Sequence, residues 1–130
     1  MTALALTGNG GRVLGSPQST GGDGPTHLSV HPSGSWLLSA NYSSGSVAVH
    51  PIAADGSLGT RTDLVRHDTP PPGPQGAPHA HQILTSPDGG HVLAVDLGTD
   101  AVYTYALDTS AGKLTRVSYA GFAPGAGPRH

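Results

Sequence analysis

The sequence predicts an all-β fold, a partial β-propeller, because one unit of strands and turns occurs twice. Residues 24–59 and 79–115 share three short β-forming runs separated by Gly-, Pro- and Ser-rich turns. An internal period near 50 residues of strands and turns is typical of propeller blades. The matched positions, each pair 55 residues apart, are Pro32 and Pro87, Gly34 and Gly89, Leu38 and Leu93, Asn41 and Asp96, Val47 and Val102, and Ile52 and Leu107.

The composition disfavours helices. The chain of 130 residues holds 20 glycines and 12 prolines, and all eight of its acidic residues are aspartate. Glycine and proline are the poorest helix formers. A chain this rich in glycine and proline could also be disordered. The regular alternation of valine and leucine argues instead for half-buried strands.

The charge pattern excludes several kinds of partner. The net charge is −2 and the six basic residues are scattered, so no nucleic-acid partner is expected. Without cysteine there is neither a disulfide nor a thiolate metal site. No basic leader or long apolar run is present, so we expect no membrane partner and a cytoplasmic location.

We predict a single partial propeller domain over residues 1–130, with about two complete four-stranded blades. The expected parts are the remnant of a preceding blade with its loop (1–23), a blade (24–67), a proline-rich loop (68–78), a second blade (79–120) and the entry to a further blade (121–130). Five of the eleven loop residues are prolines, which lack the amide hydrogen that a strand ladder needs.

Strands are expected wherever apolar residues alternate between turn signals. These runs are Ala3–Leu6, Arg12–Leu14, His27–His31, Trp36–Tyr42, Ser46–Ile52, Leu64–Arg66, His81–Thr85, His91–Leu97, Ala101–Leu107 and Leu114–Tyr119. Trp36 is expected to pack between blades or at the rim, whereas Tyr103 and Tyr105 are expected to contribute at most one ring to the core. Positive backbone φ angles are expected at Gly24, Gly45 and Gly127.

Chemically capable residues lie at the entry to each unit, where Thr26, His81 and Arg129 are equivalent. The first strand of each propeller blade lines the central channel, so these three residues should be neighbours in space. A histidine exchanges a proton near neutral pH, and an arginine binds a carboxylate or phosphate through two hydrogen bonds. Together they favour a small anionic substrate.

Four motifs, PHAHQ at 78–82, DLGTD at 96–100, ANYSSGSV at 40–47 and APGAGPRH at 123–130, resemble those of a known family. The chain resembles, over nearly its whole length, the bacterial lactonase family of seven-bladed propellers. That family contains the propeller-type 6-phosphogluconolactonases and is related to the fungal carboxy-muconate cyclases. The resemblance implies a fragment of an enzyme that hydrolyses 6-phosphoglucono-δ-lactone to 6-phosphogluconate in the pentose phosphate pathway.

The resemblance also implies roles for single residues. His81 and Arg129 are the expected catalytic residues, and His79, Thr26 and His130 are expected to bind substrate. The family's acidic pocket residue and a further arginine are expected beyond the last residue of this sequence. Asp96 and Asp100 are nearest in sequence, but we predict that they bond to the backbone of the DLGTD turn.

Several alternatives remain open on the sequence. Apart from His27 and His31, which are four residues apart within one predicted strand, the histidines show no HxxxH or HExxH spacing. Neither a metal nor a cofactor is therefore expected, although His79 and His81 could share a metal contact. Other possible functions are a carboxy-muconate cycloisomerase and a non-catalytic propeller that binds proteins or sugars. Exposed blade edges also allow self-association. Turnover by the chain alone is not expected, because two blades leave the channel open to water.

Overall fold

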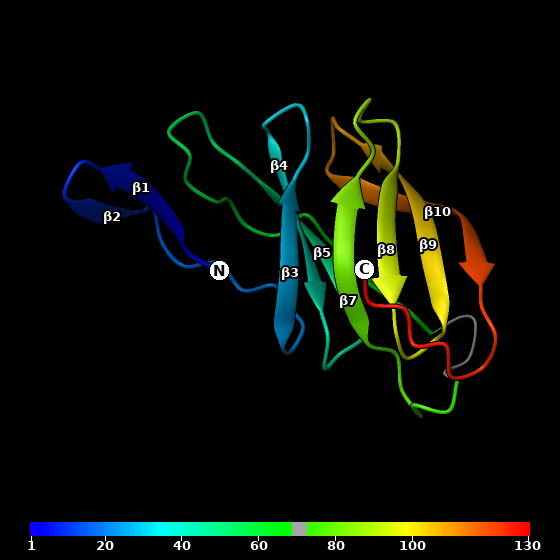
Figure 1. Cartoon of the computed structure of the whole chain (residues 1–130). Helices are drawn as coiled ribbons and strands as arrows, with labels where there is room; N and C mark the ends of the chain where they lie inside the picture. Colours follow the sequence, from blue (N-terminus) through cyan, green and yellow to red (C-terminus); the bar gives the residue numbers. More distant parts are fainter. Residues whose placement is uncertain (69–72) are drawn as a thin grey trace.

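The computed structural model describes residues 1–68 and 73–130, and their regular structure consists of β-strands (Figure 1). The ten strands form three antiparallel sheets, which confirms the predicted all-β class. Within these residues no helix is long and apolar enough to cross a membrane. The predicted loop at 68–78 lies partly outside the described residues.

A two-stranded hairpin precedes two four-stranded sheets, each of which has its strands in sequence order. Every predicted strand is present, with ends that differ by at most two residues. The hairpin contains β1 (Ala3–Thr7) and β2 (Gly10–Leu14), the first four-stranded sheet β3 (Pro25–Val30), β4 (Trp36–Asn41), β5 (Ser46–Pro51) and β6 (Asp63–Arg66), and the second β7 (Ala80–Thr85), β8 (Val92–Asp96), β9 (Ala101–Asp108) and β10 (Lys113–Gly121).

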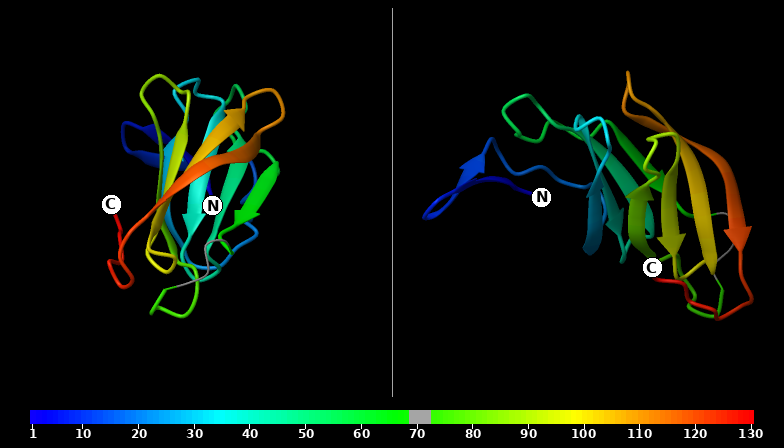
Figure 2. Two further views of the ribbon diagram at one scale, coloured as in Figure 1. Left: turned by 90° about the vertical axis from the view of Figure 1, so that its right-hand side faces the viewer. Right: turned by 45° about the horizontal axis from the view of Figure 1, so that its top comes forward.

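The two four-stranded sheets pack face to face, with β7 against β3 and β4, while the hairpin projects away from them (Figure 2). Equivalent positions of the repeat show what this packing does. Ile83 is fully buried between the sheets, whereas its equivalent Leu28 is 54% exposed. Leu38 is fully buried in the same interface, whereas its equivalent Leu93 is 39% exposed. Each four-stranded sheet therefore has one covered face and one open face in the described structure.

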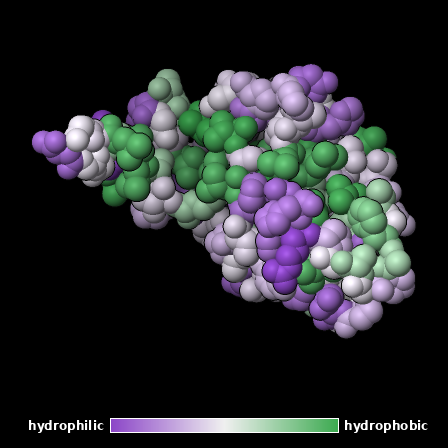
Figure 3. Space-filling view, in the orientation of Figure 1, coloured by the Kyte–Doolittle hydropathy of each residue, from purple (hydrophilic) through white to green (hydrophobic). Residues whose placement is uncertain are grey.

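Apolar side chains gather on the open face of the first sheet. Figure 3 shows them extending from the β1–β2 hairpin across the adjoining strands. Leu4 and Leu6 of the hairpin and Leu28 and Val30 of β3 are all more than half exposed. The hairpin therefore shields this face only in part.

Two tyrosines of β9 contradict the expectation that at most one of them enters the core. Tyr103 and Tyr105 are 0% and 1% exposed. Residues two apart on a strand point to the same side of the sheet, so both rings face inward. The prediction was wrong because it placed them on opposite faces.

The predictions for Trp36 and the turn glycines are confirmed. Trp36 is 8% exposed, and its indole Nε1 donates a hydrogen bond to the Thr109 carbonyl of the other sheet at 3.2 Å. Gly24, Gly45 and Gly127 have φ angles of 61°, 54° and 55°. At Gly45 a Cβ atom would lie 2.3 Å from a side-chain atom of Pro78. The close approach of Pro78, in the segment that connects the two sheets, is therefore a second reason why this position must be glycine.

The interface between the sheets predicts unequal effects of two equivalent substitutions. Ile83→Ala leaves a cavity in a closed interface and should lower the free energy of unfolding by about 2–4 kcal/mol. Leu28→Ala, the matched control on the open face, should change it by less than about 1 kcal/mol. Urea unfolding followed by tryptophan fluorescence measures both. Equal losses would contradict the described packing.

Candidate functional site

The entry strands of the two sheets meet at a pair of β-bulges. The ladder between β3 and β4 skips Thr26, and the ladder between β7 and β8 skips its equivalent His81. A bulge leaves one residue unpaired and redirects its side chain, and bulges are common beside active sites. The Thr26 hydroxyl donates to the backbone carbonyl of His81 at 3.2 Å. The repeat thus brings these two predicted site residues into contact.

The last residues of the chain return to the same place. The rings of His81 and His130 meet edge to face, with centroids 5.0 Å apart. Arg129 is exposed, and its charge lies close enough to affect His81. Figure 1 shows the C-terminus beside β7, and Figure 3 shows polar residues gathered over this region. The structure therefore places Thr26, His81 and Arg129 together, and these three residues are called the blade-entry cluster below.

The environment of His81 disfavours its protonated form. Burial lowers the pKa of His81 from its ordinary value of 6.5, and the positive charges of His130 and Arg129 lower it further. A hydrogen bond to the backbone of Arg129 acts in the opposite direction but does not outweigh them. Its Nδ1 is buried without a hydrogen-bond partner in the described part of the chain. At neutral pH the imidazole is therefore uncharged.

His79 is held by Tyr42, a residue that the sequence analysis did not single out. His79 Nδ1 lies 3.1 Å from the Tyr42 carbonyl oxygen, and the two rings stack with centroids 4.4 Å apart. A carbonyl only accepts hydrogen bonds, so Nδ1 carries the hydrogen and Nε2 keeps a lone pair. The sequence held one sign of this role. The position equivalent to Tyr42 in the second unit is Leu97, so the aromatic residue is a departure from the repeat.

Asp96 performs the predicted turn role and a further one, whereas the prediction was wrong for Asp100, whose carboxylate accepts from the Gly125 and Gly127 amides outside the turn. Asp96 Oδ1 accepts from the amides of Gly98 and Thr99 at 2.9 and 3.0 Å. Its Oδ2 also lies 2.7 Å from Nδ1 of His67, with both side chains 0% exposed. Burial alone would raise the pKa of Asp96, but the bonds from His67 and from the backbone amides of His79 and Thr99 lower it. His67 had been given no role.

Metal-binding side chains do not converge in the described residues. No group of three or more His, Cys, Asp or Glu side chains there is placed to hold a metal ion. His79 and His81 are two apart on the entry strand, but the described structure adds no third ligand to them. The expectation of a metal-free protein continues to rest on the sequence.

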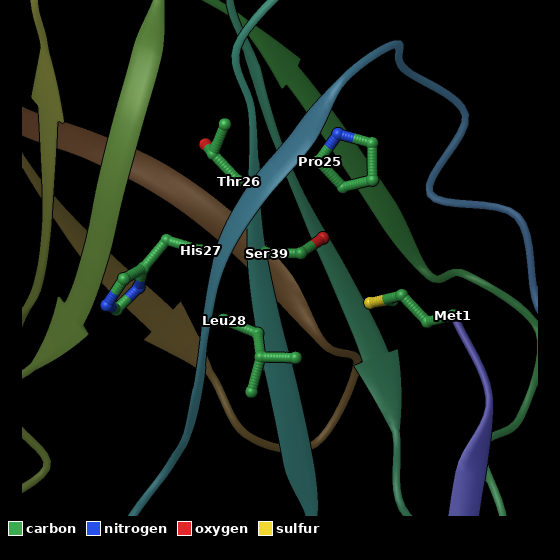
Figure 4. Close-up of a pocket in the computed structure, with 6 residues that line it drawn as sticks. All are labelled: Met1, Pro25, Thr26, His27, Leu28 and Ser39. Atoms are coloured by element: carbon green, nitrogen blue, oxygen red, sulfur yellow. The ribbon is translucent and has the colours of Figure 1, made fainter.

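A cavity of about 240 Å³ lies beside β3, near the N-terminus (Figure 4). It is lined by Met1, Pro25, Thr26, His27, Leu28 and Ser39. Of the predicted site residues it includes Thr26 alone, and Figure 4 shows the His27 ring on the side of β7. The cavity thus lies beside Thr26, and its lining does not include His79, His81, Arg129 or His130.

The fold and the blade-entry cluster define the class of protein. The chain belongs to the family described as lactonase, 7-bladed beta-propeller, whose model matches residues 2–130. It is 44% identical over 110 residues to the 6-phosphogluconolactonase of Bacillus subtilis, covering 84% of this chain and 31% of that enzyme. These findings confirm the resemblance seen in the four motifs.

Solved structures agree with this assignment. A Bacteroides fragilis protein proposed to be a 6-phosphogluconolactonase superimposes with a TM-score of 0.87 at 34% identity, over 99% of this chain and 39% of that one. The periplasmic gluconolactonase of Pseudomonas aeruginosa gives a TM-score of 0.79 at 36% identity, over 87% of this chain and 33% of that one. The chain thus spans about a third of the length of these relatives.

The surroundings of His81 predict its titration. By NMR, His81 should titrate below 6.5, because protonation meets burial and two nearby positive groups. A histidine with a lowered folded-state pKa resists protonation, so its contribution to stability is present above the unfolded pKa and is lost as the pH falls. Arg129→Gln removes one positive charge and should raise the His81 pKa. A His81 pKa at or above 6.5 in the unaltered chain would contradict the described site.

Proposed function

We propose that the blade-entry cluster forms part of the active site of a sugar lactonase that hydrolyses 6-phosphoglucono-δ-lactone to 6-phosphogluconate. Membership of the lactonase family and the likeness to the B. subtilis enzyme support this reaction. The observation that carries the proposal is the contact of His81 with the C-terminal segment, which joins a proton acceptor to an anion-binding arginine.

Hydrolysis of a lactone needs a proton acceptor and then a proton donor. A water oxygen bonds to the carbonyl carbon, the bond from that carbon to the ring oxygen breaks, and the ring oxygen takes up a proton. In the proposed mechanism His81 accepts the proton of the attacking water and returns it to the ring oxygen. Its lowered pKa supports the first step, because the imidazole is uncharged at neutral pH.

The other predicted residues have supporting roles in this proposal. Arg129 binds the phosphate group of the substrate through two parallel hydrogen bonds. The Thr26 hydroxyl donates to the backbone of His81, which leaves its oxygen lone pairs for a substrate hydroxyl. His79 presents the Nε2 lone pair that its bond to Tyr42 leaves free, and His130 closes the other side of the His81 ring.

The setting of the reaction is part of the proposal. The relatives are about three times as long as this chain, so we propose that further pocket groups belong to sequence outside the matched third. The cytoplasmic location stays a prediction, because one structural relative is a periplasmic enzyme. Self-association also stays a prediction.

An assay of acid release from the lactone tests the proposal. The chain is compared with its His81→Ala variant, and the B. subtilis enzyme with a variant that carries alanine at the position aligned with His81. The substitution should reduce kcat by about 10²–10⁴-fold, the usual contribution of a general acid–base residue. Arg129→Gln should mainly raise KM for the phosphorylated lactone.

His91→Ala is the matched control, because His91 is exposed and precedes β8 at the end away from Asp96 and the blade entries. It should leave the rate unchanged. Undiminished activity after the His81 change, in either protein that turns over the lactone, would remove the proposed role. A parallel assay on carboxy-muconate distinguishes the cycloisomerase alternative.

A further inference from the structure

We propose that Asp96 and Asp100, the two aspartates of the DLGTD turn, are positioning residues that hold the His79–His81 and Arg129–His130 segments together. This inference rests on the proposed function for its catalytic meaning. The hydrogen bonds made by the two aspartates are observed whether or not the protein is a lactonase. Asp96 and Asp100 are 0% and 4% exposed, so neither is placed to touch substrate.

Asp100 holds the segment that leads to Arg129. Its Oδ2 accepts a hydrogen bond from the Gly125 amide at 2.8 Å, and its Oδ1 accepts one from the Gly127 amide, also at 2.8 Å. Its backbone carbonyl accepts a third, from the Phe122 amide at 2.8 Å. Bonds to a charged acceptor are stronger than neutral ones, so these amides fix the path of the chain two residues before Arg129.

Asp96 holds the start of β7 in the same manner. Its Oδ1 accepts from the His79 amide at 2.8 Å, and the Leu97 amide donates to the His79 carbonyl at 3.0 Å. Both backbone groups of His79 are therefore bound to the turn. Oδ2 is bonded to His67, so both carboxylate oxygens are engaged in a buried setting.

The first repeat unit provides an internal comparison for Asp100. Its equivalent is Gly45, with φ 54° against 50° for Asp100, which is the one described residue other than glycine with a positive φ. A non-glycine residue at such a φ is uncommon, although aspartate tolerates it better than most. At Gly45 the neighbouring Pro78 leaves no room for a side chain, whereas at Asp100 the side chain is present and bonded.

Asn41, the equivalent of Asp96, also differs. Its amide nitrogen donates to Ser46 Oγ at 3.1 Å within its own sheet, and its Oδ1 has no hydrogen-bond partner in the described structure. The backbone bond at this position is retained, since the Tyr42 amide donates to the Gly24 carbonyl at 2.8 Å. Buried aspartates that bond to other segments thus occur in the second unit, which contains His81 and precedes Arg129. The first unit folds without them.

Asp100→Gly tests the proposal, because it restores the residue found at the equivalent turn and requires no new backbone conformation. The variant should keep the unfolding transition and β-sheet signal of the parent chain. Hydrogen exchange at the Gly125 and Gly127 amides should become about 10- to 100-fold faster. The NMR contact between the rings of His81 and His130 should be lost, and the His81 pKa should rise toward its ordinary value.

Asp108→Ala is the control, because Asp108 is exposed and, among the described residues, its carboxylate accepts from the nearby Ser110 and Ala111 alone. It should change neither the exchange of the two glycine amides nor the ring contact. If Asp100→Gly fails to fold, Asp100→Asn retains one acceptor oxygen and should release only one of the two amides.

The outcomes separate this inference from the proposed function, because exchange and ring contacts are measured without turnover. Unchanged exchange and an intact His81–His130 contact in Asp100→Gly would overturn the positioning role, whatever the assay gives. Release of the segment, combined with a parent protein that does not hydrolyse the lactone, would retain the positioning role and reject the lactonase proposal.

Discussion

The buried carboxylate of Asp96 joins three parts of the chain that are distant in sequence. It bonds His67 at the end of the first four-stranded sheet, His79 at the start of the second, and the turn between β8 and β9. Removing a charge from water is costly, and a buried carboxylate is tolerated only when its hydrogen-bonding capacity is satisfied. The imidazole and three backbone amides satisfy it here. At this edge a buried charged group therefore helps to set the relative position of the two sheets, in addition to the apolar packing between them.

Local patterns and the internal repeat explain why the sequence predicts so much of the fold. Strand positions follow from alternation and from Gly and Pro turns, which act over a few residues. The 55-residue period then extends one unit to the other, as the matching ladders of β3 with β4 and of β7 with β8 illustrate, each with a bulge at its entry. The error at Tyr103 and Tyr105 concerned which face a residue occupies and left the existence of the strand unaffected.

The candidate site was less predictable because its contacts join residues that no local pattern connects. The repeat placed Thr26 opposite His81, and the turn motif indicated backbone bonding by Asp96. The bond from Asp96 to His67 spans 29 residues, and the stack of Tyr42 on His79 spans 37. Neither pair has a characteristic spacing, so only the packing of one sheet on the next reveals it.

Departures from the repeat are the better guide to function in a molecule of this kind. Equivalent positions of the two units have the same backbone conformation. The same fold therefore accommodates Thr26 and Gly45 in the first unit and His81 and Asp100 in the second. A histidine at a bulge and an aspartate at a positive φ are not needed to form the blade, because the first unit forms it without them. Their presence in the second unit agrees with the site proposed above. The same reasoning applies to Tyr42, because its equivalent Leu97, which lies next to Gly127, has no ring to stack on a histidine.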